Sequence, residues 1–337
     1  MTENLKPITL AGSIETLLSH MALLGAAHMV EEAYGAGTVR LRWTDSADAR
    51  PQLAAPSLDS EALGHVVRDH ARHHVEDATG WMHRKAPEYG ALFSARTNVP
   101  STEAGWEELL GIRQGSLRPL RGLDSAMILG IGERAWWHRN DQRLRPDHGA
   151  SAWEMRTRNK GMEFVTHALL PAGRAVAARE AAAVTSGLLG ETLVDEPGKG
   201  KSDSRTATGL APLGPVDAAR AWAGLWGLAS LPVWADAHDV STSTASIRPM
   251  AGQPGRLLMP VPTSWVTLSR FTAALRSRHL VEMVHASSQT EALVGALGVE
   301  VSPLASWGFG HILAFPVLRT GSTSASERRA LSGKAVA

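Results

Sequence analysis

The residues with the most obvious capacity for chemistry are four histidines of one short segment. At helical spacing, His65, Asp69 and His73 share one face, and His70 and His74 share another. Paired histidines with a carboxylate are a common set of zinc ligands. The segment HVVRDHARHHVED, however, lacks the His-Glu-x-x-His order of zinc proteases and reverses the His-Asp order of HD phosphohydrolases. We therefore expect a polar, solvated helix face here and no metal site.

Two other short motifs match phosphate-handling sites only in part. Gly200–Ser202 matches the end of a phosphate-binding loop, but Asp195 stands where the first glycine of that loop is required. His138–Asp141 is similar to a kinase catalytic loop, yet no glycine-rich loop, strand lysine or Asp-Phe-Gly accompanies it. The chain has no Gly-x-Ser-x-Gly elbow and no cysteine, which excludes thiolate zinc sites and cysteine nucleophiles. The sequence predicts neither an enzyme nor a bound cofactor.

Basic residues are concentrated in one stretch of a chain that is nearly neutral overall. Residues 113–160 hold ten Lys or Arg against five Asp or Glu, whereas the whole chain holds 34 against 33. Guanidinium groups suit phosphate oxygens, and three tryptophans, Trp136, Trp137 and Trp153, would stack on bases if exposed. The alternative is that the tryptophans anchor the core and the arginines form a solvated face. The predicted nucleic-acid contacts in this stretch are Arg113, Arg118, Arg121, Arg139, Arg143, Arg145, Arg156, Arg158 and Lys160.

Length and composition indicate a folded protein with two closely packed units. With 337 residues, 44% of them hydrophobic, the chain exceeds the size at which one core usually stops growing. The start of the chain shows no secretion signal, and no apolar run approaches the roughly 20 residues that span a bilayer. Since the lack of cysteine also fits a reducing compartment, we expect a cytoplasmic protein without membrane contact. The expected units are an N-terminal α+β subdomain (1–191), an exposed basic loop (192–215), a C-terminal α+β subdomain (216–320) and a flexible tail (321–337).

Hydrophobic periodicity predicts a mixed α+β fold that is rich in helix, with short strands forming a small sheet. The loop at 192–215 is dense in Gly, Ser, Lys and Pro and has no apolar period, so we expect it to be exposed and to present a mobile basic finger. The predicted contacts of this finger are Lys199, Lys201 and Arg205. Helices are expected at 14–33, 59–78, 103–110, 120–131, 162–190, 216–231 and 264–278, and strands at 39–43, 244–250, 256–261 and 309–318.

Three blocks of the chain resemble subtype-specific proteins of type I-G CRISPR systems, formerly called type I-U. The blocks are 15–45, 149–165 and 203–233, and the last leads from a Pro-Gly turn into a tryptophan-rich helix and then Leu-Pro-Val. The resemblance implies a large-subunit-like component of a CRISPR RNA-guided surveillance complex. Its implied partners are the other effector subunits, the guide RNA, the target DNA and a recruited helicase-nuclease. In such complexes base pairing reads the sequence, while proteins hold phosphates and steady the displaced strand.

The expected function is therefore a non-catalytic nucleic-acid-binding subunit in antiviral defence, which helps target DNA recognition or R-loop stabilisation. Two alternatives stay open. A structural subunit would grip protein neighbours through the tryptophan-rich helix at 216–231 and would not contact DNA directly. A metal-dependent nuclease or phosphohydrolase would use the histidine-rich helix with distant carboxylates, and metal content after purification distinguishes that case.

Overall fold

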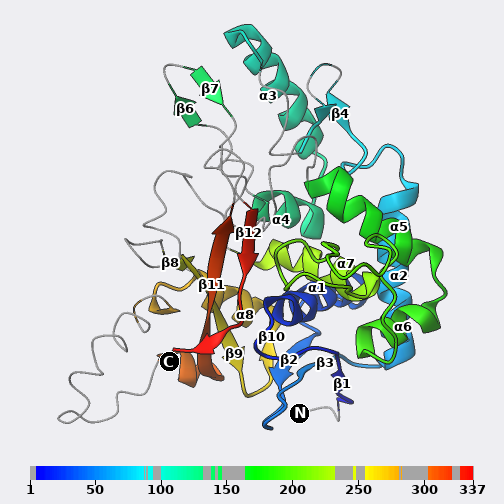
Figure 1. The fold of residues 1–337 in the computed structure, drawn as a ribbon, viewed down its shortest axis with the longest axis vertical. Coiled ribbons are helices and arrows are strands. Elements are labelled where there is room, and N and C mark those ends of the chain that lie inside the picture. Colours follow the sequence, from blue (N-terminus) through cyan, green and yellow to red (C-terminus); the bar gives the residue numbers. More distant parts are fainter. Residues whose placement is uncertain are drawn as a thin grey trace.

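Helices and two larger antiparallel sheets pack against each other in this protein (Figure 1). The computed structural model describes residues 5–86, 88, 90–93, 100–131, 138–140, 143–145, 164–231, 246–247, 255–280, 282, 303–320 and 327–336. Helices alternate with short strands along these segments, which confirms the predicted mixed α+β class. None of the helices in this part of the chain is long and apolar enough to cross a membrane.

The helices begin close to where the periodicity predicts them, and several have side-chain caps. Asp59 accepts a hydrogen bond from the backbone of Ala62, and Thr102 accepts one from Gly105. The single helix expected over 162–190 is wrong, because the backbone is extended at Arg179 and Glu180 and divides it. The helices are α1 (Leu17–Tyr34), α2 (Ser60–Glu76), α3 (Glu103–Leu117), α4 (Gly122–Gly130), η2 (Val165–Leu169, a π-helix), α5 (Leu170–Ala178), α6 (Ala181–Leu189), α7 (Ala218–Trp226), η3 (Gly227–Ser230, a 3-10 helix), α8 (Leu268–Arg276) and α10 (Pro303–Ser306).

All of the strand pairs are antiparallel. The first sheet has the order β1-β3-β2-β10, and the second has the order β12-β11-β9-β8, with β13 also paired to β11. Two separate hairpins, β4-β5 and β6-β7, lie outside these sheets. The strands are β1 (Ile8–Thr9), β2 (Arg40–Trp43), β3 (Pro51–Ala54), β4 (Lys85–Ala86), β5 (Gly90–Ala91), β6 (His138–Asn140), β7 (Arg143–Arg145), β8 (Ser246–Ile247), β9 (Arg256–Pro262), β10 (Val266–Thr267), β11 (Phe309–Thr320), β12 (Glu327–Ala330) and β13 (Lys334–Ala335).

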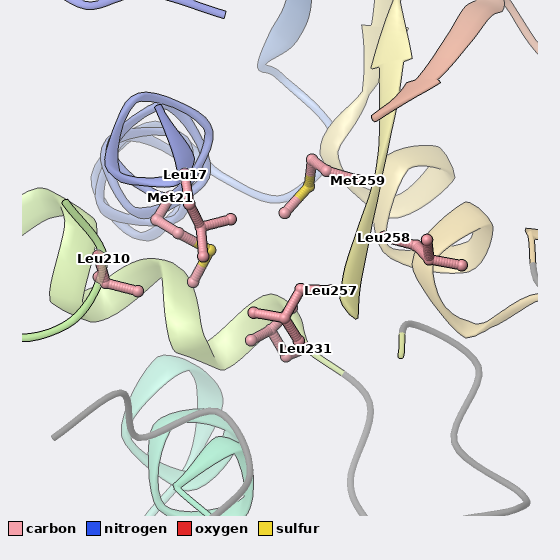
Figure 2. Close-up of a pocket in the computed structure, with 7 residues that line it drawn as sticks. All are labelled: Leu17, Met21, Leu210, Leu231, Leu257, Leu258 and Met259. Atoms are coloured by element: carbon pink, nitrogen blue, oxygen red, sulfur yellow. The ribbon is translucent and has the colours of Figure 1, made fainter. Parts of the chain in front are cut away.

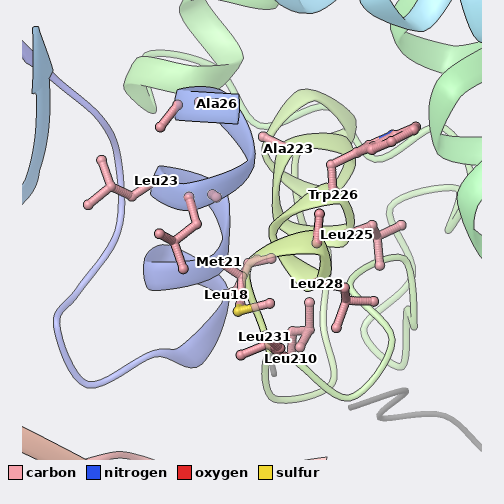
Figure 3. Packing of buried hydrophobic residues seen from close by; sticks show 14 of the residues in the cluster. Leu18, Met21, Leu23, Ala26, Leu210, Ala223, Leu225, Trp226, Leu228 and Leu231 are labelled. Atoms are coloured by element: carbon pink, nitrogen blue, oxygen red, sulfur yellow. The ribbon is translucent and has the colours of Figure 1, made fainter. Parts of the chain in front are cut away.

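The centre of the core is the contact between α1 and α7. In Figure 3, Leu18 and Met21 of α1 face α7 and η3, while Leu23 points to the opposite side of α1. Buried residues of both expected subdomains belong to one continuous hydrophobic cluster. The strand β10 also pairs with β2, which joins the two halves of the chain in one sheet. The two expected subdomains therefore share a single core.

A small cavity remains where α1 approaches β9 (Figure 2). Its volume is about 10 Å³, close to the space of one water molecule. Because its lining is apolar, a water there would find no hydrogen-bond partners, and we expect the cavity to be dry. It is a packing void and not a ligand site. The lining residues are Leu17, Met21, Leu210, Leu231, Leu257, Leu258 and Met259.

The C-terminal segment corrects one prediction. The tail at 321–337 was expected to be flexible, yet β12 and β13 both pair with β11. Ala330 is buried, and its N–H donates a hydrogen bond to the carbonyl of Gly209 at 2.8 Å. The N–H of Gly333 donates to the carbonyl of Glu15 at 2.9 Å. Pairing to an existing strand uses backbone groups, so it needs no apolar pattern that composition could reveal.

Candidate functional site

The basic loop at 192–215 is folded against the body of the protein. Residues 206–211 are buried, and Leu210 belongs to the hydrophobic core. The carboxylate of Asp195, itself buried, accepts hydrogen bonds from the N–H of Gly198 at 2.9 Å and the hydroxyl of Thr206 at 2.5 Å. The prediction of an exposed loop is therefore wrong for its second half, because local polar contacts replace the missing apolar period. Its predicted contact residues lie on the exposed part, namely Lys199, Lys201 and Arg205.

A clamp made by Arg179 and Asp217 closes the two ends of this loop. The guanidinium of Arg179 donates to Asp217 at 2.8 Å, to Glu196 at 2.6 Å and to the carbonyl of Val194 at 2.6 Å. Asp217 is 1% exposed and accepts from the backbone of Val194 and from Ala219 at the start of α7, each at 2.9 Å. One buried carboxylate thus fixes the loop end, caps α7 and neutralises Arg179.

Replacing Asp217 by alanine is expected to lower the free energy of unfolding by about 3–5 kcal/mol, because it leaves the charge of Arg179 without its buried partner and uncaps α7. Urea unfolding followed by circular dichroism measures the loss. The matched control is Asp203→Ala, since Asp203 is exposed in the same loop and its replacement should change stability by less than about 0.5 kcal/mol. Similar losses for both variants would contradict the role of the clamp.

Arg113, one of the predicted nucleic-acid contacts, is buried. Its side chain is among the largest fully buried ones, with a residue exposure of 1%. The guanidinium donates to the carbonyl of Leu92 and lies 5.5 Å from the ring centre of Phe93. Burial lowers its pKa to about 9. The prediction that Arg113 contacts phosphates is wrong, because a residue at this position of α3 faces the core and the charge pattern alone does not show which side that is.

Arg118 and Arg121 are exposed in the turn between α3 and α4. Arg121 donates to the carbonyl of Leu120 at 2.7 Å, so this guanidinium is held against the turn. The helix α3 also lies beside β7, and both project from the packed body (Figure 1).

Three further predicted contacts belong to the β6-β7 hairpin, where Arg139 is opposite Leu144, Asn140 is opposite Arg143, and Arg145 is opposite His138. Two basic groups, at the turn and in the hairpin, thus flank one helix, α3. Some predicted residues lie outside the described part of the chain: Trp136, Trp137, Trp153, Arg156, Arg158 and Lys160.

The tryptophan-rich helix is not available to a partner. Trp222 and Trp226 are each 0% exposed. Their rings are 5.6 Å apart in an edge-to-face arrangement, and both pack against the histidines of α2. The expectation that this helix grips neighbouring proteins is therefore wrong, since α7 runs through the interior of the protein (Figure 3).

The histidine-rich helix α2 has a wet face and a buried face. His65, Asp69 and His73 are exposed, as predicted. The side chains of His70 and His74 are only 6% and 7% exposed and contact the rings of α7, so the prediction of a solvated face is wrong for these two. Spacing showed that the five residues form two faces, but not that aromatic rings of a distant segment cover one of them.

The faces of α2 border an open cavity of about 600 Å³ next to α1. The Nε2 of His74 lies 2.8 Å from the carboxylate of Asp124 in α4, which also accepts a hydrogen bond from the indole of Trp81 at 2.7 Å. The Nδ1 of His74 lies 2.9 Å from the carbonyl of His70. Since both acceptors lack hydrogens, the ring of His74 donates on both sides and forms an ion pair with Asp124. In the described segments, no group of three or more His, Asp or Glu is arranged to hold a metal ion.

No protein-family model and no curated protein sequence matches this chain. The geometry therefore offers two candidate sites, the basic groups on both sides of α3 and the histidine-lined cavity beside α1 and α2.

Proposed function

We propose that the protein is a non-catalytic nucleic-acid-binding subunit of a CRISPR RNA-guided type I surveillance complex. The proposal rests on the three sequence blocks that resemble type I-G proteins and on one structural observation. That observation is the presence of basic groups on both sides of α3, at Arg118 and Arg121 and in the β6-β7 hairpin.

A projecting helix with arginines on either side is suited to follow a phosphate backbone. Arginine binds phosphate oxygens with two parallel hydrogen bonds, and contacts of this kind position a nucleic acid without reading its sequence. In an RNA-guided complex the guide reads the sequence, so phosphate contacts are what a protein subunit must add. The exposed Lys199 and Lys201 of the loop would supply a second, separate contact.

The test uses the full chain, co-expressed with the other subunits and guide RNA of its own gene cluster. We expect it to copurify with the complex and to strengthen binding of the target duplex. The double variant Arg118→Glu/Arg121→Glu should weaken duplex binding about tenfold or more at low salt, and each lost phosphate contact should reduce the salt slope of log K by about 0.9. Hairpin variants, Arg139→Glu with Arg143→Glu, should act in the same direction.

The matched control is Arg174→Glu/Arg278→Glu, which makes the same change in net charge at exposed positions of α5 and of the turn after α8. This control should keep the affinity and salt slope of the parent. Equal weakening by both double variants would reduce the effect to net charge, and unchanged binding in the first would remove the α3 region from the interface. A loss that depends on the flanking sequence would indicate base reading instead of phosphate contact.

A further inference from the structure

The cavity beside α1 and α2 contains a buried side chain without a partner. His70 lines this cavity, its side chain is 6% exposed, and neither ring nitrogen has a hydrogen-bond partner within the described segments. Its Nε2 is 3.7 Å from the Oε2 of Glu32, which is beyond hydrogen-bonding distance. An unsatisfied buried polar group costs about 1–3 kcal/mol, so the ring is a candidate to meet a group that the chain does not supply.

The three carboxylates around the cavity differ in how they are neutralised. Asp69 pairs with Arg68 at 2.9 Å, and Asp124 pairs with His74 at 2.8 Å. Glu32, half exposed, has no lysine or arginine within ion-pair distance in the part of the chain that the structure describes. Burial, and then repulsion from Asp124, raises the pKa of Glu32. The cavity therefore has one carboxylate with no matching cation.

His70 adds a second acceptor next to this carboxylate. Burial, with the neighbouring His74 and His73, lowers the pKa of His70 well below its usual value, so the ring is neutral and one nitrogen carries a bare lone pair. A carboxylate and an unprotonated ring nitrogen can both be satisfied by a cation with N–H donors. The other walls are partly apolar and would contact a hydrocarbon chain, since they include Met29, Ala33, Ala62 and Val66.

We propose that this cavity binds a primary alkylammonium group, held between the Nε2 of His70 and the carboxylate of Glu32. The separation of 3.7 Å lets one ammonium nitrogen lie within hydrogen-bond distance of both acceptors. A volume of about 600 Å³ lies within the range of small-molecule sites and accommodates the chain that carries the amine. The ammonium comes either from a free polyamine or from a lysine side chain. This inference does not depend on the proposed nucleic-acid function.

Isothermal titration calorimetry of the full chain with spermidine, and separately with N-acetyl-lysine amide, tests the site and distinguishes its two sources. We expect saturable one-site binding by at least one of them, and the tighter one identifies the source. The variant Glu32→Gln keeps the shape of the side chain and removes its charge, and it should weaken that binding tenfold or more. In ¹⁵N spectra of the histidine rings, the same amine should shift the ring nitrogens of His70.

The matched control is Glu61→Gln, since Glu61 is an exposed carboxylate in the first turn of α2 and is absent from the cavity wall. This variant should bind the amine as tightly as the parent. Equal weakening by Glu32→Gln and Glu61→Gln would reduce the effect to non-specific charge attraction and overturn the proposal. An absence of saturable binding for both amines up to concentrations on the order of 10 mM would overturn it as well.

Discussion

Replacing Gly25 by alanine is expected to lower the free energy of unfolding by at least about 3 kcal/mol. A Cβ at this position of α1 would lie 1.8 Å from the carbonyl oxygen of Ala223 and 2.9 Å from the backbone nitrogen of Gly227. Both contacts are with backbone atoms, so no side-chain rotation relieves them and the two helices would have to separate. The pair α1 and α7 forms the centre of the core, and separating it loosens many apolar contacts at once (Figure 3).

The control for this variant is a glycine of the same kind in a helix with open space. A Cβ at Gly111 in α3 would meet no atom within 4 Å. The change Gly111→Ala should therefore stabilise the protein by about 0.5–1 kcal/mol, the ordinary helix preference of alanine over glycine. Urea unfolding of both variants under the same conditions gives the comparison. If Gly25→Ala were as stable as the parent, the close approach of the two helices would be contradicted.

The same contact shows what the sequence could and could not predict. Apolar periodicity predicts α1 and α7 to within a few residues, because each helix repeats its apolar residues at helical spacing. The pairing of these helices depends on Gly25, Gly224 and Gly227, which periodicity treats as weak positions in a helix. A small side chain reveals a close approach only once the partner backbone is known.

The β-structure was predictable only in part. The strands β2, β9 and β11 carry apolar residues in the expected stretches and were predicted. The strands β12 and β13 were missed, since Glu327–Ala330 and Lys334–Ala335 have hardly any apolar pattern and are ordered by backbone pairing to β11. The order of strands depends on contacts between distant residues, which one sequence does not encode in any local signal.

The candidate sites divide in the same way. Charge density singled out the arginines around α3, but the direction of each side chain follows from the packing, and Arg113 faces Leu92 and Phe93 in the core. Helical spacing grouped His70 with His74 and separated them from the wet face. The cavity itself could not be predicted, because it needs a carboxylate from α1 and another from α4 to meet α2.

Stability is expected to fall strongly between pH 7 and pH 5, because buried histidines must stay neutral in the fold. Burial lowers the pKa of His20 and of His28 to about 4, from an ordinary value of 6.5. Below pH 6.5 the unfolded chain therefore takes up protons that the folded chain excludes, and each histidine contributes a slope of about 1.4 kcal/mol per pH unit. These two residues account for a loss of about 4 kcal/mol over that range. His70 adds to the loss, whereas Glu32, with a raised pKa, opposes it.

Urea unfolding at several pH values measures this slope, and one substitution tests its origin. The Nε2 of His28 lies 2.8 Å from the hydroxyl of Ser230, a contact that an amide can also make, so His28→Gln removes the titrating group and keeps a partner for Ser230. The variant should lose about one proton of the pH dependence, a decrease in slope of about 1.4 kcal/mol per pH unit. His311→Gln, at an exposed position of β11, should leave the slope unchanged. If His28→Gln also leaves it unchanged, the loss of stability in acid arises from groups other than this buried ring.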